Sequence, residues 1–166
     1  MMVELKDDLE RLIPPSAELE IRQIPYYREK KEVVWKEREW GKWVNCRRTW
    51  VDYYMREEDT QVLFLEKISL PDRLIHALKF LGISEEEAEE SLSFWNIARE
   101  EGTLEPAELE IYHRLRRFAD SLFIQVVLIE VGEKQEGMRK LEYAEEEKLL
   151  DLISDGGLFF IEKNGG

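Results

Sequence analysis

Cationic and aromatic side chains are concentrated in one stretch of the sequence, residues 22–54. Its basic part, residues 22–48, has nine Lys and Arg against four Glu, a net charge of +5; the whole chain carries −13, so the remaining residues carry −18. Eight tryptophans and tyrosines are interleaved with these cations. Cationic groups neutralise carboxylates or phosphates, and aromatic faces stack on apolar surfaces or on unpaired bases. The segment therefore predicts a surface that binds an acidic partner.

Eight residues of this segment are our candidate binding residues, because they combine both kinds of chemistry. The cations are Arg28, Lys36, Lys42, Arg47 and Arg48, and the indoles are Trp35, Trp40 and Trp43. The leading hypothesis is a non-enzymatic binding or assembly subunit whose segment 22–54 contacts an acidic protein partner or a second copy of the chain, forming a homo-oligomer. A second hypothesis places single-stranded nucleic acid on the same residues, with indoles stacked on bases and cations on phosphates.

An ordinary structural explanation competes with both hypotheses. The tryptophans would then belong to the hydrophobic core, and the stems of Lys and Arg would cover them. The cations would pair with carboxylates elsewhere in the chain. The two explanations differ in one observable, since only a binding surface leaves the indoles exposed to solvent.

Other residues with catalytic or metal-binding chemistry form weaker patterns. Glu110 and His113 are three residues apart, the spacing that places a carboxylate and an imidazole on one helical face, but di-iron bundles need two such pairs. The only other histidine, His76, has Arg73 three positions earlier, although Asp72 lies one turn before it. Cys46 precedes two arginines, which would favour its thiolate. No phosphate-binding glycine loop, nucleophile elbow or paired-cysteine metal motif occurs, so we expect no metal, no cofactor and a protein that is not an enzyme.

Length and composition predict a single domain, 1–166, that folds around one core. The chain has 166 residues, 43% of them hydrophobic, and one cysteine, which cannot form an internal disulfide. The first thirty residues lack the apolar run of a signal peptide, which predicts a cytoplasmic protein. The longest nearly unbroken apolar stretch, 122–131, is half the length of a membrane-spanning helix, so we expect no contact with a membrane.

The first half of the sequence has mainly strand-forming patterns. A short helix is predicted before Pro14 and a strand around 18–22 that is closed by Pro25. The runs 49–54 and 62–65 are rich in aromatic and β-branched residues, and the polar link between them is typical of a hairpin turn. Gly41 indicates an earlier turn, which would complete an antiparallel meander. The alternative for 40–54 is a helix, since its apolar residues also recur at helical spacing.

The second half of the sequence predicts helices with recognisable beginnings. Ser69 with Asp72, and Ser84 with Glu87, have the spacing of capping residues at a helix N-terminus. Further predicted elements are a helix after Pro106, a strand at 124–131, a helix at 143–153 and a strand at 158–161. The expected fold class is α+β, a mainly antiparallel sheet formed by the N-terminal meander and the late strands, with amphipathic helices packed on it. A mainly helical fold is the runner-up.

Overall fold

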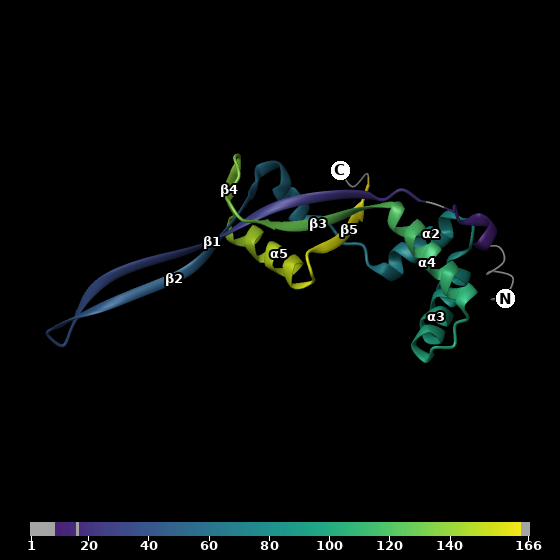
Figure 1. Cartoon of the computed structure of the whole chain (residues 1–166), viewed down its shortest axis with the longest axis horizontal. Coiled ribbons are helices and arrows are strands. Elements are labelled where there is room, and N and C mark those ends of the chain that lie inside the picture. The colour runs from purple at the N-terminus through teal and green to yellow at the C-terminus, as the bar shows by residue number, and fades with distance from the viewer. Residues whose placement is uncertain (1–8, 16, 164–166) are drawn as a thin grey trace. The chain divides into compact units, whose positions relative to one another are not determined.

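The computed structural model describes residues 9–15 and 17–163, and it confirms the α+β class. Five strands form one sheet in the order β4-β2-β1-β3-β5, with β2 antiparallel to both β1 and β4 (Figure 1). This sheet excludes the mainly helical alternative. In chain order the elements are β1 (Glu20–Glu39), β2 (Lys42–Arg56), the 3₁₀ helix η1 (Glu57–Phe64), α2 (Leu70–Phe80), α3 (Glu85–Glu101), α4 (Pro106–Ser121), β3 (Phe123–Val131), β4 (Met138–Lys140), α5 (Tyr143–Ser154) and β5 (Leu158–Glu162).

The chain forms two compact units. Unit 1 comprises Met1–Arg22, Glu66–Val126 and Phe159–Gly166, and unit 2 comprises Gln23–Leu65 and Val127–Leu158. Three strands, β1, β3 and β5, contribute residues to both units. That the two units fold as a single domain stays a prediction.

Unit 1 is built on α2, α3 and α4, and both predicted capping residues are confirmed. The hydroxyl oxygens of Ser69 and Ser84 each accept a hydrogen bond, 3.3 Å long, from the backbone N–H three residues further on. α3 ends at Gly102, whose positive φ of 71° is a conformation that glycine adopts without steric cost. The inward sides of the helices form one core, in which Leu74, Leu78, Leu92, Trp95, Tyr112 and Leu115 are buried.

A buried arginine joins four segments of unit 1. The guanidinium of Arg73 on α2 lies 3.0 Å from a carboxylate oxygen of Asp120 on α4, and it donates a 2.5 Å hydrogen bond to the carbonyl of Ile68. Its plane also lies 3.7 Å from the ring centre of Phe160 on β5. Burial lowers the pKa of Arg73, and the Asp120 carboxylate opposes that shift. Because a buried charge without partners is costly, this ion pair specifies how the segments meet.

Unit 2 contains the β1–β2 hairpin, and here two local predictions were wrong. β1 begins at Glu20 as expected, but it runs through Pro25 to Glu39 instead of ending at the proline. The hairpin turn lies at Trp40 and Gly41, not in the polar link after 54, and residues 62–65 are not a strand because 57–64 form the 3₁₀ helix η1. The glycine turn was predicted correctly. The helical alternative for 40–54 is excluded, since 42–56 form β2.

The remaining predictions for the second half agree with the structure, with one omission. The helices after Pro106 and at 143–153, and the strands at 124–131 and 158–161, correspond to α4, α5, β3 and β5. The short strand β4 was not predicted, because three residues are too few to show a period. At the N-terminus residues 9–12 are helical, and the rest of that predicted helix lies outside the described residues.

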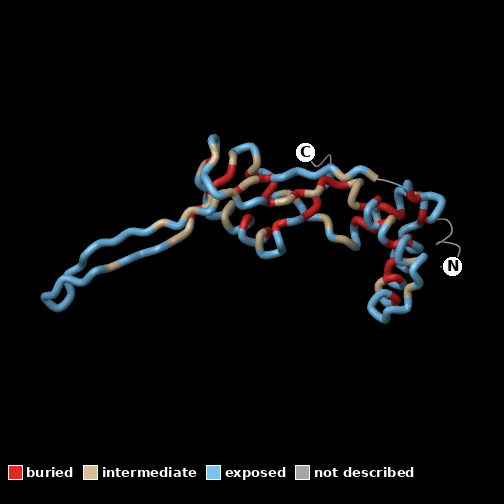
Figure 2. Tube along the Cα trace, viewed as in Figure 1, coloured by how far each residue is buried: buried red, intermediate tan, exposed pale blue. Residues whose placement is uncertain are grey.

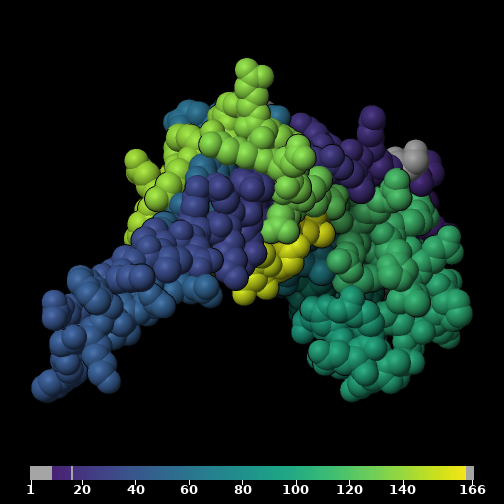
Figure 3. Space-filling view, turned by 60° about the vertical axis from the view of Figure 1, so that its left-hand side comes forward, coloured from purple at the N-terminus to yellow at the C-terminus, as the bar shows by residue number. Residues whose placement is uncertain are grey.

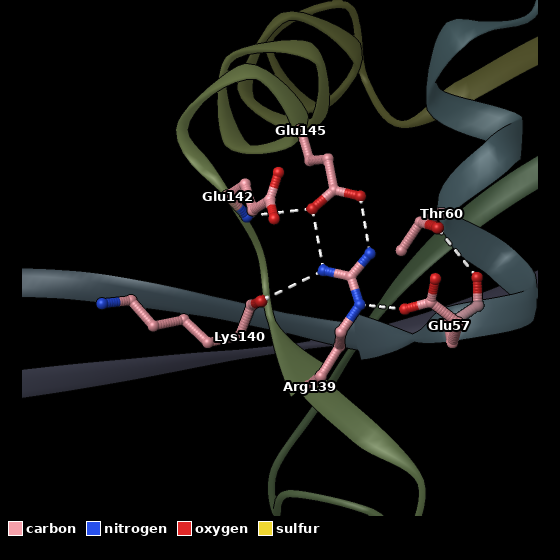
Figure 4. Close-up of polar contacts among 6 residues, drawn as sticks. All are labelled: Glu57, Thr60, Arg139, Lys140, Glu142 and Glu145. Atoms are coloured by element: carbon pink, nitrogen blue, oxygen red, sulfur yellow. Dashed lines mark hydrogen bonds and ion pairs between the residues drawn. The ribbon is translucent and has the colours of Figure 1, made fainter.

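An arginine on β4 connects three elements of unit 2 (Figure 4). Two guanidinium nitrogens of Arg139 donate to the two carboxylate oxygens of Glu145 on α5, at 2.8 and 2.7 Å, and a third donates to Glu57 on η1. The Glu145 carboxylate also accepts a hydrogen bond of 2.9 Å from the backbone N–H of Glu142, where α5 begins. The two carboxylates raise the pKa of Arg139, and the guanidinium lowers the pKa of Glu145. These contacts hold β4, α5 and η1 together beside the base of the β1–β2 hairpin.

Candidate functional site

The outer part of the hairpin is an unsupported two-stranded ribbon. We define the arm as residues 28–53, which are joined by twelve residue pairs of the β1–β2 register, from Arg28 with Tyr53 to Glu39 with Lys42. β4 pairs with β2 only at 54–56. At the base of the arm the backbone N–H of Leu141 donates a hydrogen bond to the carbonyl of Tyr53, and Lys140 lies 3.5 Å from a carboxylate oxygen of Asp52. Beyond these contacts Figure 1 shows β1 and β2 alone. From 32 to 49 every residue is exposed except Cys46, which is partly buried (Figure 2). In the space-filling view the arm is a slender projection of side chains (Figure 3).

The antiparallel register divides the arm into two faces of different charge. Cross-strand partners share a face, and successive residues alternate between faces. One face, which we call the basic face, carries five cations and one carboxylate, a net charge of +4; they are Arg28, Lys30, Lys36, Arg38, Arg47 and Glu32. The opposite face carries three cations and four carboxylates, a net charge of −1; they are Lys31, Lys42, Arg48, Glu29, Glu37, Glu39 and Asp52. The positive charge of the segment is therefore concentrated on one side of the ribbon.

The predicted site residues are consequently not all together. The basic face holds Arg28, Lys36, Trp43 and Arg47, the opposite face holds Trp35, Lys42 and Arg48, and Trp40 lies in the turn. Two cations of the basic face, Lys30 and Arg38, were not selected from the sequence. The alternation of strand residues identifies them. Once the turn is placed at 40–41, even positions of β1 and odd positions of β2 point to the same face.

The indoles of the arm are exposed to solvent. Their exposed fractions are 39% for Trp35, 67% for Trp43 and 99% for Trp40. This finding excludes the core explanation for these three rings, whereas Trp95 of α3 is a core residue. Large exposed apolar side chains gathered on one element are typical of interaction surfaces.

Trp40 adopts an unfavourable backbone conformation in the turn. Its φ is +50° and that of Gly41 is +77°, and the two residues link the paired positions 39 and 42. Positive φ at both positions defines a type I′ turn, whose first position favours Asn, Asp or Gly. A bulky residue in the left-handed region costs about 1–2 kcal/mol. The ring touches little of the chain to offset this cost, since it is almost fully exposed.

Some cations of the arm are paired within the ribbon and others are not. Arg47 lies 2.7 Å from a carboxylate oxygen of Glu32, and Lys31 lies 3.0 Å from Glu29. Arg38 is stacked over Trp43, with its guanidinium carbon 5.9 Å from the ring centre. Among residues 9–15 and 17–163, neither Arg38 nor Lys36 has a carboxylate within 4.0 Å. The part of the basic face nearest the turn thus holds two cations available to a partner.

Cys46 does not have the thiolate character that its sequence neighbours suggested. Burial raises the pKa of the thiol, and the charges of Glu37 and Glu39 raise it further. Of the two arginines that follow it, Arg47 points to the other face of the ribbon, because successive strand residues alternate. Arg48 shares the face of Cys46 with Glu37 and Glu39, whose charges raise the pKa of the thiol. These surroundings therefore disfavour the thiolate form of Cys46.

The remaining candidates lie on α2 and α4. Glu110 and His113 line a surface pocket of 630 Å³ on α4, and a second pocket of 780 Å³ lies at the base of the arm beside Trp50 and Tyr143. The ring of His76 packs edge-on against Phe123, with ring centres 5.1 Å apart. Within the described part of the chain, no three His, Cys, Asp or Glu side chains gather where they could hold a metal ion.

Comparison with known proteins adds no relative. No family model, no curated protein and no solved structure matches this chain. In the described residues, none of the helices is both long and apolar enough to cross a membrane. The fold and the arm therefore define the class of protein: it is an α+β protein that carries an exposed β-ribbon.

Proposed function

We propose that this protein is a non-enzymatic binding or assembly subunit whose β1–β2 arm docks on an acidic protein surface. The observation that supports the proposal most is Trp40, a nearly fully exposed indole held in a strained turn at the end of the arm. Strained residues persist where they serve a function, because a relaxed turn residue would otherwise stabilise the fold. An indole at the end of a ribbon is suited to filling an apolar pocket on a partner.

The charge of the arm supports an acidic partner. The basic face carries +4, and Lys36 and Arg38 close to the turn have no carboxylate of their own among the described residues. Complementary charge accelerates association and aligns the partners, whereas most of the affinity comes from buried aromatic anchors. Trp40 and Trp43 would supply the anchors, and the cations would orient the ribbon.

Single-stranded nucleic acid is the alternative, and the arm is less suited to it. Two of its cations, Lys31 and Arg47, are already paired with glutamates, and the face that carries Trp35 has no net positive charge. A single-strand site needs a positive groove that follows the phosphates. We also propose that the protein is cytoplasmic and has no catalytic activity.

Photo-crosslinking from the turn tests the proposal. A photoreactive amino acid replaces Trp40 in the full chain, in the cells where the protein is naturally made, and the matched control replaces Phe80, an aromatic residue outside the arm that is 67% exposed. We expect position 40 to form more adduct than position 80, and the adduct to map by mass spectrometry to an Asp- or Glu-rich protein surface. No excess over the control, or adducts with nucleic acid alone, would overturn the proposal.

A titration separates the nucleic-acid alternative. The tryptophan emission of the purified chain is followed while a single-stranded oligonucleotide is added at low salt, where release of counterions makes phosphate binding strongest. We expect unchanged emission. A change that disappears at high salt would favour nucleic acid as the ligand of the arm.

A further inference from the structure

We infer that the acidic surface which receives the arm is the outer face of α3 in a second copy of this chain. This inference rests on the proposed function of the arm and names its partner. It starts from a face of α3 that the described residues of unit 1 leave exposed. The inward residues of the helix are Ala88, Ser91, Leu92, Trp95 and Ala98, all buried.

Two large apolar side chains lie on the outer face of α3. Phe94 is 45% exposed and Ile97 is 54% exposed. They are three positions apart and so lie next to each other on the helix surface. Glu90 precedes Phe94 by four residues and Glu101 follows Ile97 by four, so an exposed carboxylate frames the pair on either side. We call these four residues the α3 patch.

The α3 patch is complementary in charge and in apolar surface to the end of the arm. α3 contains seven Glu and one Arg, a net charge of −6, whereas the basic face of the arm carries +4. The patch has an apolar centre with an anionic rim, and the end of the arm has exposed indoles beside unpaired cations. Interfaces are commonly built from an apolar centre within a polar rim. The chain thus carries both halves of a complementary contact.

Pairing of two arms with each other is the less favourable way to form an oligomer. The outer edges of the ribbon have unpaired backbone groups, which can add a strand from another chain. Two arms, however, would bring together surfaces that each carry a net charge of +3 over residues 28–53. Like charges repel, so the arm meets α3 rather than another arm.

The contact joins two different surfaces, and this property gives a decisive test. Each copy has one arm and one α3 patch, so association is heterologous and forms a ring or an open chain. A copy with a defective arm still has an intact patch, and a copy with a defective patch still has an intact arm. Two variants that fail to associate alone should therefore associate with each other.

Sedimentation velocity of the purified full chain provides the measurement. The variants are Trp40→Asn in the arm and Phe94→Gln in the patch, and the matched control is Phe80→Gln, at an exposed aromatic residue outside both surfaces. We expect wild type and control to self-associate at about 0.05 M salt and less at about 0.5 M, because salt screens the charge attraction. Each variant should weaken association about 30-fold, the effect of removing a central anchor. An equimolar mixture of the two should associate again.

The double variant Glu90→Gln with Glu101→Gln keeps the inference testable if Phe94→Gln disturbs folding, since both glutamates are exposed. It should weaken association and reduce its dependence on salt. A wild-type chain that remains monomeric, a mixture that remains monomeric, or patch variants that associate like wild type would each overturn the inference. In the last case, loss of association in Trp40→Asn alone would leave the proposed function of the arm standing. Wild-type association by Trp40→Asn would remove both.

Discussion

At the scale of single residues, Trp40 shows a conflict between stability and exposure. The first position of a type I′ turn is occupied most easily by Asn or Gly, and here it holds the largest side chain available at a φ of +50°. The same residue is exposed to 99%, so contacts within the chain do not compensate for the strain. Such a residue makes the arm less stable than a simpler turn would, which is expected where a ring is presented to a partner.

Replacing Trp40 by Asn should therefore stabilise the protein while it removes binding. We expect the free energy of unfolding to rise by about 1 kcal/mol, because Asn tolerates positive φ at small cost. Urea unfolding followed by circular dichroism measures the change. Trp40→Val is the control, since a β-branched residue is strained in this conformation and should give no gain in stability. A loss of stability in Trp40→Asn would contradict this account of the turn.

At the scale of elements, the two faces of the arm should differ in function. Lys36→Glu with Arg38→Glu changes the basic face, and Lys42→Glu with Arg48→Glu changes the opposite face by the same total charge. We expect the first pair to weaken partner binding about tenfold or more at about 0.15 M salt, where a charge acts over roughly 8 Å. The second pair should weaken it less. Photo-crosslinking yield at position 40 measures both, and an equal loss would mean that total charge, not the face, matters.

The contact of β4 with α5 in unit 2 predicts a dependence of stability on pH. Arg139 holds the pKa of Glu145 below its ordinary value, so the ionised carboxylate stabilises the folded state. This contribution is complete above the pKa of the unfolded chain and is lost as the pH falls through the lower folded pKa. We expect Glu145→Gln to reduce the free energy of unfolding by about 1 kcal/mol at pH 7, a modest value because solvent screens partly exposed ion pairs.

Urea unfolding of Glu145→Gln and wild type between pH 7 and pH 2 tests this prediction. The difference between the two proteins should shrink as the carboxylate of the wild type becomes protonated. Glu146→Gln serves as the control, because it leaves the ion pair of Arg139 intact. A difference that stays constant down to the lowest pH would show that the loss comes from packing of the side chain and not from its charge.

At the scale of the whole molecule, the two units share three strands. β1, β3 and β5 each contribute residues to both units, so the backbone of the sheet is divided between the units. We expect one cooperative unfolding transition, with equal calorimetric and van't Hoff enthalpies and about 0.7 kcal/mol per residue near 60 °C. Scanning calorimetry of the full chain makes the measurement. Two separate transitions would show that the units are independent domains.

Short-range patterns in the sequence were sufficient for most elements. The serine caps of α2 and α3, the helix after Pro106 and the turn at Gly41 depend on interactions over three or four residues, so they can be recognised locally. The errors occurred where residues far apart in the sequence determine the local structure. Residues 62–65 have strand-forming side chains, but 62–64 form the end of η1, which packs with α5. Pro25 lies inside β1, two residues before the first pair of the β1–β2 register, Tyr27 with Tyr54, and the ring of a proline is compatible with extended backbone.

The sequence by itself determined the segregation of charge, the local starts of the helices and the clustering of indoles with cations in 22–54. Only the tertiary structure decided whether those indoles were buried, because burial of a strand depends on what packs over it, and nothing in the described residues covers the outer arm. The register decided which cations share a face, since a shift by one residue would exchange the two sides of the ribbon. Periodicity can be recognised within one segment, whereas the exposure and the register of that segment depend on the segments next to it in the fold.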